Sequence, residues 1–331
     1  MSKEVTMRDI AKEMNISVVS VSKAVSGREG VGEQLRERIN EKAREMGYVY
    51  TSPKLNRLPK YTFCVLVSQK YISENTFYGN LYQSLVSEFA LYGHACELKT
   101  VKARNEEKTD IPSEVVDKKV DGIILMGPFS KNYVNEILRI NIPCVFLDNY
   151  TVEAIADCVV SDGMYGCQML TNYLIEKGHK RIAFVGTIKA SNSIIDRYLG
   201  FYKALIQNNI PLIPEYVLDD RGSDGYQTNV NIPSVLPDAF VCNCDEVAYH
   251  LINRLKNMGI SVPKDTSVVG YDDYTFALKS SPQLTTFRID MKEMSMNVAD
   301  IMLHKMKDSN YTTGRRVISG EIVIRDSVIQ R

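Results

Sequence analysis

Apolar residues recur three and four positions apart in three short segments between residues 6 and 48. This spacing places them on one face of a helix, so each segment is predicted to be a short amphipathic helix. Thr6 and Asp9 form a capping pattern at the first segment, Ser17 suits the N-cap of the second, and Gly47 ends the third. The positions expected to be buried are Ile10, Ala11 and Met14, then Val21, Ala24 and Val25, then Leu35, Ile39, Ala43 and Met46.

The second segment has an outward face that is not needed for packing. This face carries two small apolar side chains, two hydroxyls and an amine: Val18, Val19, Ser20, Ser22 and Lys23. Short amphipathic helices of this size are more often ordinary core helices than DNA-binding ones, so the pattern alone is compatible with a helix-turn-helix unit but does not identify one. Hydroxyls and amines there bind phosphate oxygens, while side chains at the helix tip reach base edges in the major groove.

After residue 61 the pattern changes to short apolar runs that alternate with helical spacing. Continuous apolar runs are typical of parallel sheets covered on both faces. We expect strands at 63–68, 95–101, 122–126, 143–147, 159–160, 181–186, 238–242 and 267–271. Helices are expected at 77–92, 113–119, 132–140 and 194–207, with two more ending at residues 177 and 258. These two series predict two doubly wound α/β lobes with a ligand cleft at the carboxyl ends of the strands.

Two segments of the head carry a recognisable motif. They read V-T-M-R-D-I-A at 5–11 and S-V-V-S-V-S-K-A-V-S-G at 17–27. With their surroundings, residues 2–49, they resemble the DNA-binding head of the LacI/GalR family of bacterial transcriptional regulators. The resemblance, with the chemistry above, implies base contacts from Val18, Val19 and Lys23, and phosphate contacts from Thr6, Ser17, Ser20, Ser22 and Ser26.

Residues 50–60 form a polar connector, Y-T-S-P-K-L-N-R-L-P-K. In the family this region carries a hinge helix of the type N-x-x-A-R-x-L, which inserts a leucine into the minor groove. Pro53 departs from that pattern, because proline is tolerated in a helix only within the first turn. The inserted residue is either Leu55 or Leu58, and a flexible linker is the alternative to a hinge helix.

Further family-like motifs are spread over the rest of the chain. They are L-I-E-K-G-H-K-R-I-A-F-V-G at 174–186, D-R-Y-L-G-F at 196–201, S-V-V-G-Y-D-D at 267–273, L-T-T at 284–286 and I-R-D-S at 324–327. The resemblance implies a body similar to periplasmic sugar-binding proteins, in which the chain crosses between the lobes three times. The expected parts are a head at 1–49, a hinge or linker at 50–60 and an effector-binding and dimerisation domain at 61–331. Within this domain we expect one lobe at about 61–155 and 285–331, and the other at about 156–284.

The family pattern, carried over residue by residue, also implies an effector site at the strand ends. Its expected residues are Phe77, Tyr78, Phe129, Asp148, Arg197, Arg221, Cys244 and Asp272. An arginine fork and a carboxylate, here Arg197 and Asp272, can each hold two sugar hydroxyls. Phe77 and Tyr78 suit a hydrophobic core equally well. Cys244 departs from the asparagine usual in the family, and Arg221 is either a solvated loop charge or a partner for an acidic or phosphorylated ligand.

Charge supports a local contact with nucleic acid. The whole chain has 40 Lys+Arg and 40 Asp+Glu, but residues 1–60 have 12 against 8, a charge of +4, and the remainder has 28 against 32, a charge of −4. A basic head on a mildly acidic body suits a protein that touches phosphates only with its head.

Cysteine usage and motifs narrow the function further. Seven scattered cysteines favour a reducing cytoplasm, and we expect neither an export signal nor a membrane span. Cys242 and Cys244 lack the further close ligands that a metal needs, so no metal and no cofactor are expected. Because no catalytic motif such as G-x-S-x-G, a P-loop or G-x-G-x-x-G is present, an enzyme is not expected.

These observations favour a homodimeric transcriptional regulator, expected to be a repressor, that binds operator DNA and responds to a small molecule. The family resemblance implies that this molecule is a sugar. The alternative is a carbohydrate-binding protein without a DNA function. The sequence leaves open whether the small molecule releases the protein from DNA or holds it there.

Overall fold

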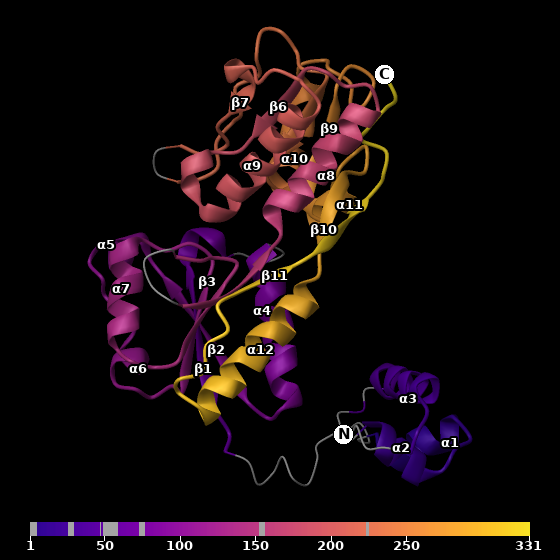
Figure 1. The fold of residues 1–331 in the computed structure, drawn as a ribbon, viewed down its shortest axis with the longest axis vertical. Coiled ribbons are helices and arrows are strands. Elements are labelled where there is room, and N and C mark those ends of the chain that lie inside the picture. The colour runs from indigo at the N-terminus through magenta and orange to yellow at the C-terminus, as the bar shows by residue number, and fades with distance from the viewer. Residues whose placement is uncertain are drawn as a thin grey trace. The chain divides into compact units, whose positions relative to one another are not determined.

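The computed structural model describes residues 5–25, 30–46, 48, 59–72, 77–151, 156–222 and 225–331 (Figure 1). The chain divides into two compact units, residues 1–61 with 87–95 and residues 62–86 with 96–331. Within the described ranges, no helix is long and apolar enough to cross a membrane.

The head consists of the three helices that the spacing predicts: α1 (Met7–Glu13), α2 (Val18–Val25) and α3 (Glu33–Glu45). Ile10, Val21 and Ile39, one from each helix, are fully buried against one another. Thr6 and Asp9 form the expected capping box at α1. Asn15 takes a left-handed backbone, with a φ of 53°, in the turn before α2, a conformation that asparagine adopts more easily than most residues.

The first lobe is built on a six-stranded sheet in the order β11-β5-β4-β3-β1-β2. Its strands are β1 (Thr62–Ser68), β2 (Ala95–Val101), β3 (Gly122–Met126), β4 (Cys144–Leu147), β5 (Asp157–Ser161) and β11 (Arg315–Ile318). The chain also forms α4 (Phe77–Leu91), α5 (Ala103–Glu107), α6 (Ser113–Val116), α7 (Lys131–Arg139) and α12 (Met291–Lys307) here. Figure 1 shows α5, α6 and α7 on one side of this sheet and α12 on the other. The sheet is therefore covered on both faces, as the apolar runs predict.

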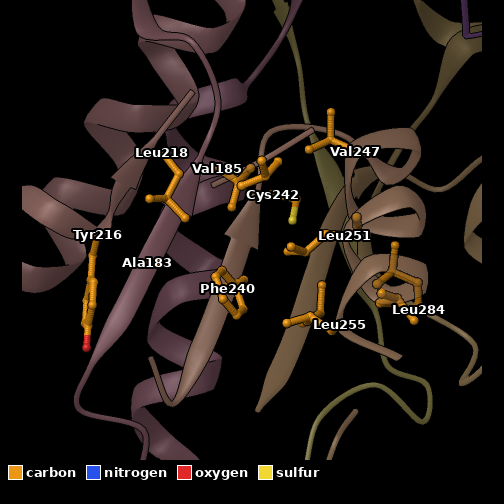
Figure 2. Packing of buried hydrophobic residues seen from close by; sticks show 14 of the residues in the cluster. Ala183, Val185, Tyr216, Leu218, Phe240, Cys242, Val247, Leu251, Leu255 and Leu284 are labelled. Atoms are coloured by element: carbon orange, nitrogen blue, oxygen red, sulfur yellow. The ribbon is translucent and has the colours of Figure 1, made fainter. Parts of the chain in front are cut away.

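The second lobe has the sheet order β12-β10-β9-β8-β6-β7. Its strands are β6 (Ile182–Val185), β7 (Val217–Leu218), β8 (Ala239–Cys242), β9 (Ser267–Asp272), β10 (Thr285–Ile289) and β12 (Gly320–Val323), and its helices are α8 (Gly163–Glu176), α9 (Asn192–Gln207), α10 (Asp245–Asn257) and α11 (Thr275–Lys279). Figure 2 shows Phe240 of β8 beside Leu251 and Leu255 of α10, within one buried cluster. This packing fixes the start of α10 at the carboxyl end of β8.

Helices α8 and α9 of the second lobe pack unusually closely. A Cβ added to Gly200 of α9 would lie 2.0 Å from the backbone oxygen of Met164 in α8. Only a residue without a side chain allows this approach. Gly200 therefore lets α9 lie directly on α8, with Arg197, one turn earlier on α9, at the cleft described below.

The described chain passes from one sheet to the other at three places, after β5, after β10 and after β11. The strand pairing corrects the expected limits of the lobes. β5 pairs with β4 and β11 in the first sheet, although residues from about 156 onward were expected in the other lobe. β10 and β12 pair in the second sheet, although 285–331 was expected in the first lobe. A short strand that is buried on both faces suits either sheet, so its apolar pattern does not identify its neighbours.

Candidate functional site

The outward face of α2 is exposed as the sequence predicts. The side chains of Val18 and Val19 are 41% and 63% exposed, whereas Val21 on the inner face is fully buried. The Ser17 hydroxyl accepts a hydrogen bond of 3.0 Å from the Ser20 backbone N–H, which caps the first turn of α2. The hydroxyl oxygens of Ser17 and Ser20 lie 2.8 Å apart. Two hydroxyls and two small apolar side chains are thus grouped at the N-terminal tip of this helix.

The other expected DNA-contacting residues have different surroundings. The Thr6 hydroxyl donates to Asp9 Oδ2 at 2.6 Å, so its proton is used within the capping box of α1. Ser22 and Lys23 are half-buried. The Nζ of Lys23 lies close to Gly30, 2.9 Å from the position that a Cβ on that residue would occupy. Ser26, Leu55 and Leu58 lie outside the described residues, and so does most of the expected hinge.

A cavity of about 380 Å³ lies between the two lobes at the carboxyl ends of their strands. This volume is in the range of sites for small organic ligands. Among the residues expected from the sequence, those that line it are Phe77, Tyr78, Asp148, Arg197, Arg221, Cys244 and Asp272. Phe129 does not belong to this lining, because its ring stacks on Tyr133 with a centroid distance of 5.3 Å and packs against the core of the first lobe.

Arg197 is a buried guanidinium held on several sides. Its side chain projects from α9, which the Ser191 hydroxyl caps, and the residue is 5% exposed. Nη1 donates to the Asn243 carbonyl oxygen at 2.6 Å, and Nη2 donates to Asp272 Oδ1 at 3.2 Å. The guanidinium carbon also lies 4.0 Å from the centroid of the Tyr271 ring, a cation–π arrangement. Such a preorganised fork is suited to binding the oxygens of a ligand.

Asp148 and Asp272 occupy corresponding places in the two lobes. Asp148 follows β4 with a φ of 54°, and Asp272 ends β9 with a φ of 108°. Left-handed backbone is costly for residues other than glycine, though less so for aspartate and asparagine, and it is concentrated at functional sites. Burial raises the pKa of Asp272 to about 7, although Arg197 opposes the shift, and burial also raises the pKa of Asp148. The Tyr78 hydroxyl donates to Asp148 Oδ2 at 2.8 Å. Both carboxyl groups therefore lie where ligand hydroxyls can donate to them.

Asn243 and Cys244 directly precede α10, and they differ in what their side chains contact. Asn243 is 1% exposed, and its amide nitrogen donates to the Val185 carbonyl oxygen at 3.0 Å and to Asp220 Oδ2 at 2.9 Å. Its amide is therefore used inside the protein. Cys244 is the N-cap of α10, and burial raises the pKa of its thiol far above the usual value. The cleft thus presents a neutral thiol at this position, which is only a weak hydrogen-bond donor.

Several residues of the lining were not among the sequence expectations. They include Lys70, Tyr71, Ser191, Ser193, Ile194, Tyr226, Gln227, Glu246 and Tyr274. The place of Ser193 in the cleft could have been predicted from the sequence, because Ser193 lies four residues before Arg197 on α9 and thus on the same helix face. Lys70 and Tyr226 lie in connecting segments, where the spacing of residues does not show which way a side chain points. Among the residues that the structure describes, no group of three His, Cys, Asp or Glu side chains is placed to hold a metal ion.

Comparison with known families finds two matches along the chain. Residues 6–50 match the family described as bacterial regulatory proteins, lacI family. Residues 171–328 match the periplasmic binding protein-like domain. The two matches fall on the head and on the part of the body that contributes most of the second lobe.

Individual relatives match over nearly the full length. The HTH-type transcriptional repressor PurR of Vibrio vulnificus (strain CMCP6) is 28% identical over 335 residues, covering 98% of this chain and 98% of the relative. The HTH-type transcriptional repressor CytR of Escherichia coli (strain K12) is 25% identical over 330 residues, covering 97% of this chain and 96% of the relative.

Solved structures share the fold. A complex of the transcriptional regulator CelR with cellobiose has a TM-score of 0.70 at 22% identity and covers 98% of this chain and 100% of its own. The lac repressor dimer bound to operator and the anti-inducer ONPF has a TM-score of 0.69 at 20% identity, with 99% and 100% covered. At these identities the likeness establishes the head-and-two-lobe fold.

Proposed function

The chain belongs to the LacI family of bacterial regulatory proteins and is a DNA-binding transcriptional regulator, and from this premise we propose that it is a repressor controlled by a carbohydrate. The observation that carries the proposal is the cleft, where Asp148 of one lobe and Asp272 of the other flank the buried guanidinium of Arg197. A pyranose or furanose ring offers adjacent hydroxyls to such groups, and an aromatic wall such as Tyr78 packs against its apolar faces.

The head reads DNA with the outward face of α2. Val18 and Val19 contact base edges through apolar groups such as thymine methyls, and Lys23 approaches a guanine. The hydroxyls of Ser17, Ser20 and Ser22 bind phosphate oxygens, together with Ser26 and, when its hydroxyl turns away from Asp9, Thr6. Leu55 or Leu58 acts as the minor-groove wedge if residues 50–60 form a hinge helix on DNA.

Two such heads on a homodimer would bind the two halves of a near-palindromic operator. The carbohydrate changes operator affinity only if it binds one arrangement of the lobes more tightly than another. The relatives named as repressors and the lac repressor dimer on its operator support this assignment. We also propose that the protein works in the cytoplasm, since its operator is there.

Selection from a randomised operator library tests the DNA part. Val19→Ala should change the preferred base at one operator position several-fold, because the lost contact is to a base edge. Ser20→Ala should weaken binding to all sequences by a similar factor, because its expected partner is a phosphate. Equal losses on matched and mismatched operators for both variants would contradict the assigned roles.

A thermal-shift screen against neutral and acidic sugars tests the effector part. A ligand that binds only the folded protein stabilises it, by about 2.7 kcal/mol at a concentration of 100 times its Kd. The stabilising sugar should not raise the melting temperature of Arg197→Met. The control is Lys256→Gln, which changes an exposed lysine near the end of α10, and the sugar should raise its melting temperature as much as that of the unchanged protein. A stabilisation that is the same in Arg197→Met would place the ligand elsewhere.

A carbohydrate-binding protein without a DNA function is not favoured. The family match at 6–50 covers the head, and the full-length relatives are named as transcriptional repressors. An unchanged affinity for operator DNA in Lys23→Ala together with Val18→Ala would support that alternative again.

A further inference from the structure

We propose that the effector carries an anionic group, a carboxylate or a phosphate, and that Arg221 and Lys70 bind it at one end of the cleft. This inference rests on the proposed function, because it specifies the class of carbohydrate that the same cleft accepts. Both cations line the cavity, Lys70 from the first lobe and Arg221 from the second.

The cleft has two chemically different regions. In the first, the charge of Arg197 is already balanced, since Nη2 bonds to Asp272 and a second carboxyl group, that of Asp148, also lines the same cavity. This region offers acceptors to ligand hydroxyls and would repel an anion. We therefore infer that an anionic group binds beside Arg221 rather than beside Arg197.

Arg221 is held at the cleft with unused hydrogen-bonding capacity. Its backbone N–H donates to Thr187 Oγ1 at 3.0 Å, which fixes the position of the residue, and its side chain is 14% exposed. Nη2 lies 3.5 Å from Asp220 Oδ2, longer than the 2.7–2.9 Å typical of a strong charged hydrogen bond. Within the described part of the chain, its Nε has no hydrogen-bond partner. A largely buried guanidinium with an unused donor is costly unless a ligand supplies the acceptor.

Asp220 is the ion-pair partner of Arg221, but both of its oxygens also accept hydrogen bonds from neutral donors. Oδ1 accepts from the Thr187 backbone N–H at 2.7 Å, and Oδ2 accepts from the Asn243 amide at 2.9 Å. With Asp220 1% exposed and committed to these bonds, its role is to shape the loop. Asp220 thus contacts the guanidinium of Arg221 only at Nη2, at 3.5 Å, and Arg221 keeps donor capacity for a ligand.

Lys70 brings a second cation to the same loop from the opposite lobe. It lies on the short 3₁₀ helix η2 (Gln69–Tyr71) after β1, and its Nζ lies 5.0 Å from the centroid of the Tyr71 ring. A Cβ added to Gly225, four residues after Arg221, would lie 3.4 Å from Lys70 Nζ. Among the described residues, no carboxylate forms an ion pair with Lys70. An anion bound by both cations would join the two lobes and so favour one arrangement of them.

Glu246 is a third carboxylate of the lining, beside Asp148 and Asp272, and it also opposes anion binding. It lies in the first turn of α10, and its Oε2 accepts a hydrogen bond of 3.4 Å from the Tyr274 hydroxyl. Because the negative charge of Glu246 repels a bound anion, removing this charge should have a specific effect on anion binding. Glu246→Gln should strengthen binding of an anionic sugar while changing binding of the neutral sugar much less.

The test compares matched neutral and anionic sugars by calorimetric titration of the full chain. The pairs are glucose with glucuronate and with glucose 6-phosphate, galactose with galacturonate, and ribose with ribose 5-phosphate. In at least one pair the anionic member should bind tenfold or more tightly than its neutral parent, as expected for one charged hydrogen-bonded contact. Arg221→Gln should remove most of this preference, Arg221→Lys should keep part of it, and Lys70→Gln should reduce it. Lys256→Gln is the matched control for the loss of a positive charge elsewhere.

The outcomes separate the two proposals. If the neutral sugar binds at least as tightly as its anionic partner, and Arg221→Gln changes neither, the anion site is wrong and the carbohydrate function stands. If neither member of any pair binds, both proposals are overturned for these sugars. A preference confined to the carboxylates or to the phosphates supports the inference and identifies the anionic group. Binding of inorganic phosphate alone as tightly as a sugar phosphate would overturn it, because the hydroxyl region would then contribute nothing.

Discussion

Replacing Arg197 with methionine should destabilise the protein by an amount that depends on pH. Methionine keeps much of the length of the side chain and removes the charge. The variant loses the hydrogen bonds to the Asn243 carbonyl and to Asp272, and the packing of the guanidinium on Tyr271. It leaves the carboxyl group of Asp272, which is 4% exposed, without its cationic partner. Removing one member of a buried ion pair typically costs about 3–5 kcal/mol.

The part of this cost that depends on pH follows from Asp272. Burial raises the pKa of its carboxyl group from the ordinary 3.8 to about 7. The neutral carboxyl group of Asp272 stabilises the folded protein fully below pH 3.8, and this contribution decreases as the pH rises toward 7. In the unchanged protein, where Arg197 is present, the decrease ends once the carboxylate has formed. Arg197 lowers this pKa, so in the variant the carboxyl group stays neutral to a higher pH and the loss continues. At pH 8, one unit above the pKa, the variant should therefore lose about 1.4 kcal/mol more than at pH 5.

The assay is urea unfolding of both proteins at pH 5 and pH 8, with thermal melting as a second readout. At pH 8 the loss should lower the melting temperature by roughly 10 °C for a body of this size. The double variant Arg197→Met, Asp272→Asn is the control, because it lacks the carboxyl group that titrates. Its loss should be nearly the same at the two pH values.

An equal destabilisation of Arg197→Met at pH 5 and pH 8 would refute the reasoning. It would mean that Asp272 does not change its protonation between these values. A pH-dependent loss that persists in the double variant would assign the effect to another carboxyl group, for which Asp148 is the neighbouring candidate.

Three further predictions concern the packing of the body, the head and the cleft. Gly200→Ala should reduce the free energy of unfolding of the body by about 1–3 kcal/mol or more and so lower its melting temperature, because α9 must move away from Met164 of α8. An unchanged melting temperature would show that the two helices are not in tight contact there. Ile39→Ala, at a fully buried position of the head, should cost about 2–5 kcal/mol there and abolish operator binding, while the sugar still shifts the melting of the body. Tyr78→Phe removes the 2.8 Å hydrogen bond to Asp148 and should weaken sugar binding by roughly tenfold in calorimetric titration, with operator affinity of the free protein unchanged.

The head was predictable because its signals are local. The capping pair at Thr6 and Asp9, the N-cap at Ser17 and the spacing of Ile10, Val21 and Ile39 all act within a few residues of one another. The apolar strands were predictable for a similar reason, since burial on both faces leaves a continuous apolar run. α12 has the same kind of signal in Met294, Val298 and Met302, which are buried and four residues apart, and it was missing from the predicted elements.

The pairing of strands and part of the cleft were not predictable, because they depend on distant contacts. β5 and β10 are short and largely buried, so they suit either sheet, and their partners are determined by the folded arrangement. Arg197 and Asp272 came from motifs and line the cleft, whereas Phe129, also expected there, found a stacking partner in Tyr133 instead. The sequence could not decide whether Arg221 is a solvated loop charge or a partner for an acidic ligand, because it does not show that the loop after β7 lies at the cavity.

The three crossings between the sheets also determine when the protein can fold during its synthesis. β5 ends at residue 161, but its neighbour β11, which forms the edge of the same sheet, ends at residue 318. At about 5–20 residues per second, the ribosome adds the intervening residues in roughly 8–30 s. The first lobe therefore waits, with one edge of its sheet and the face that α12 covers exposed, until almost the whole chain has been made. Chaperones that shield apolar surface on nascent chains would act on this protein during that interval.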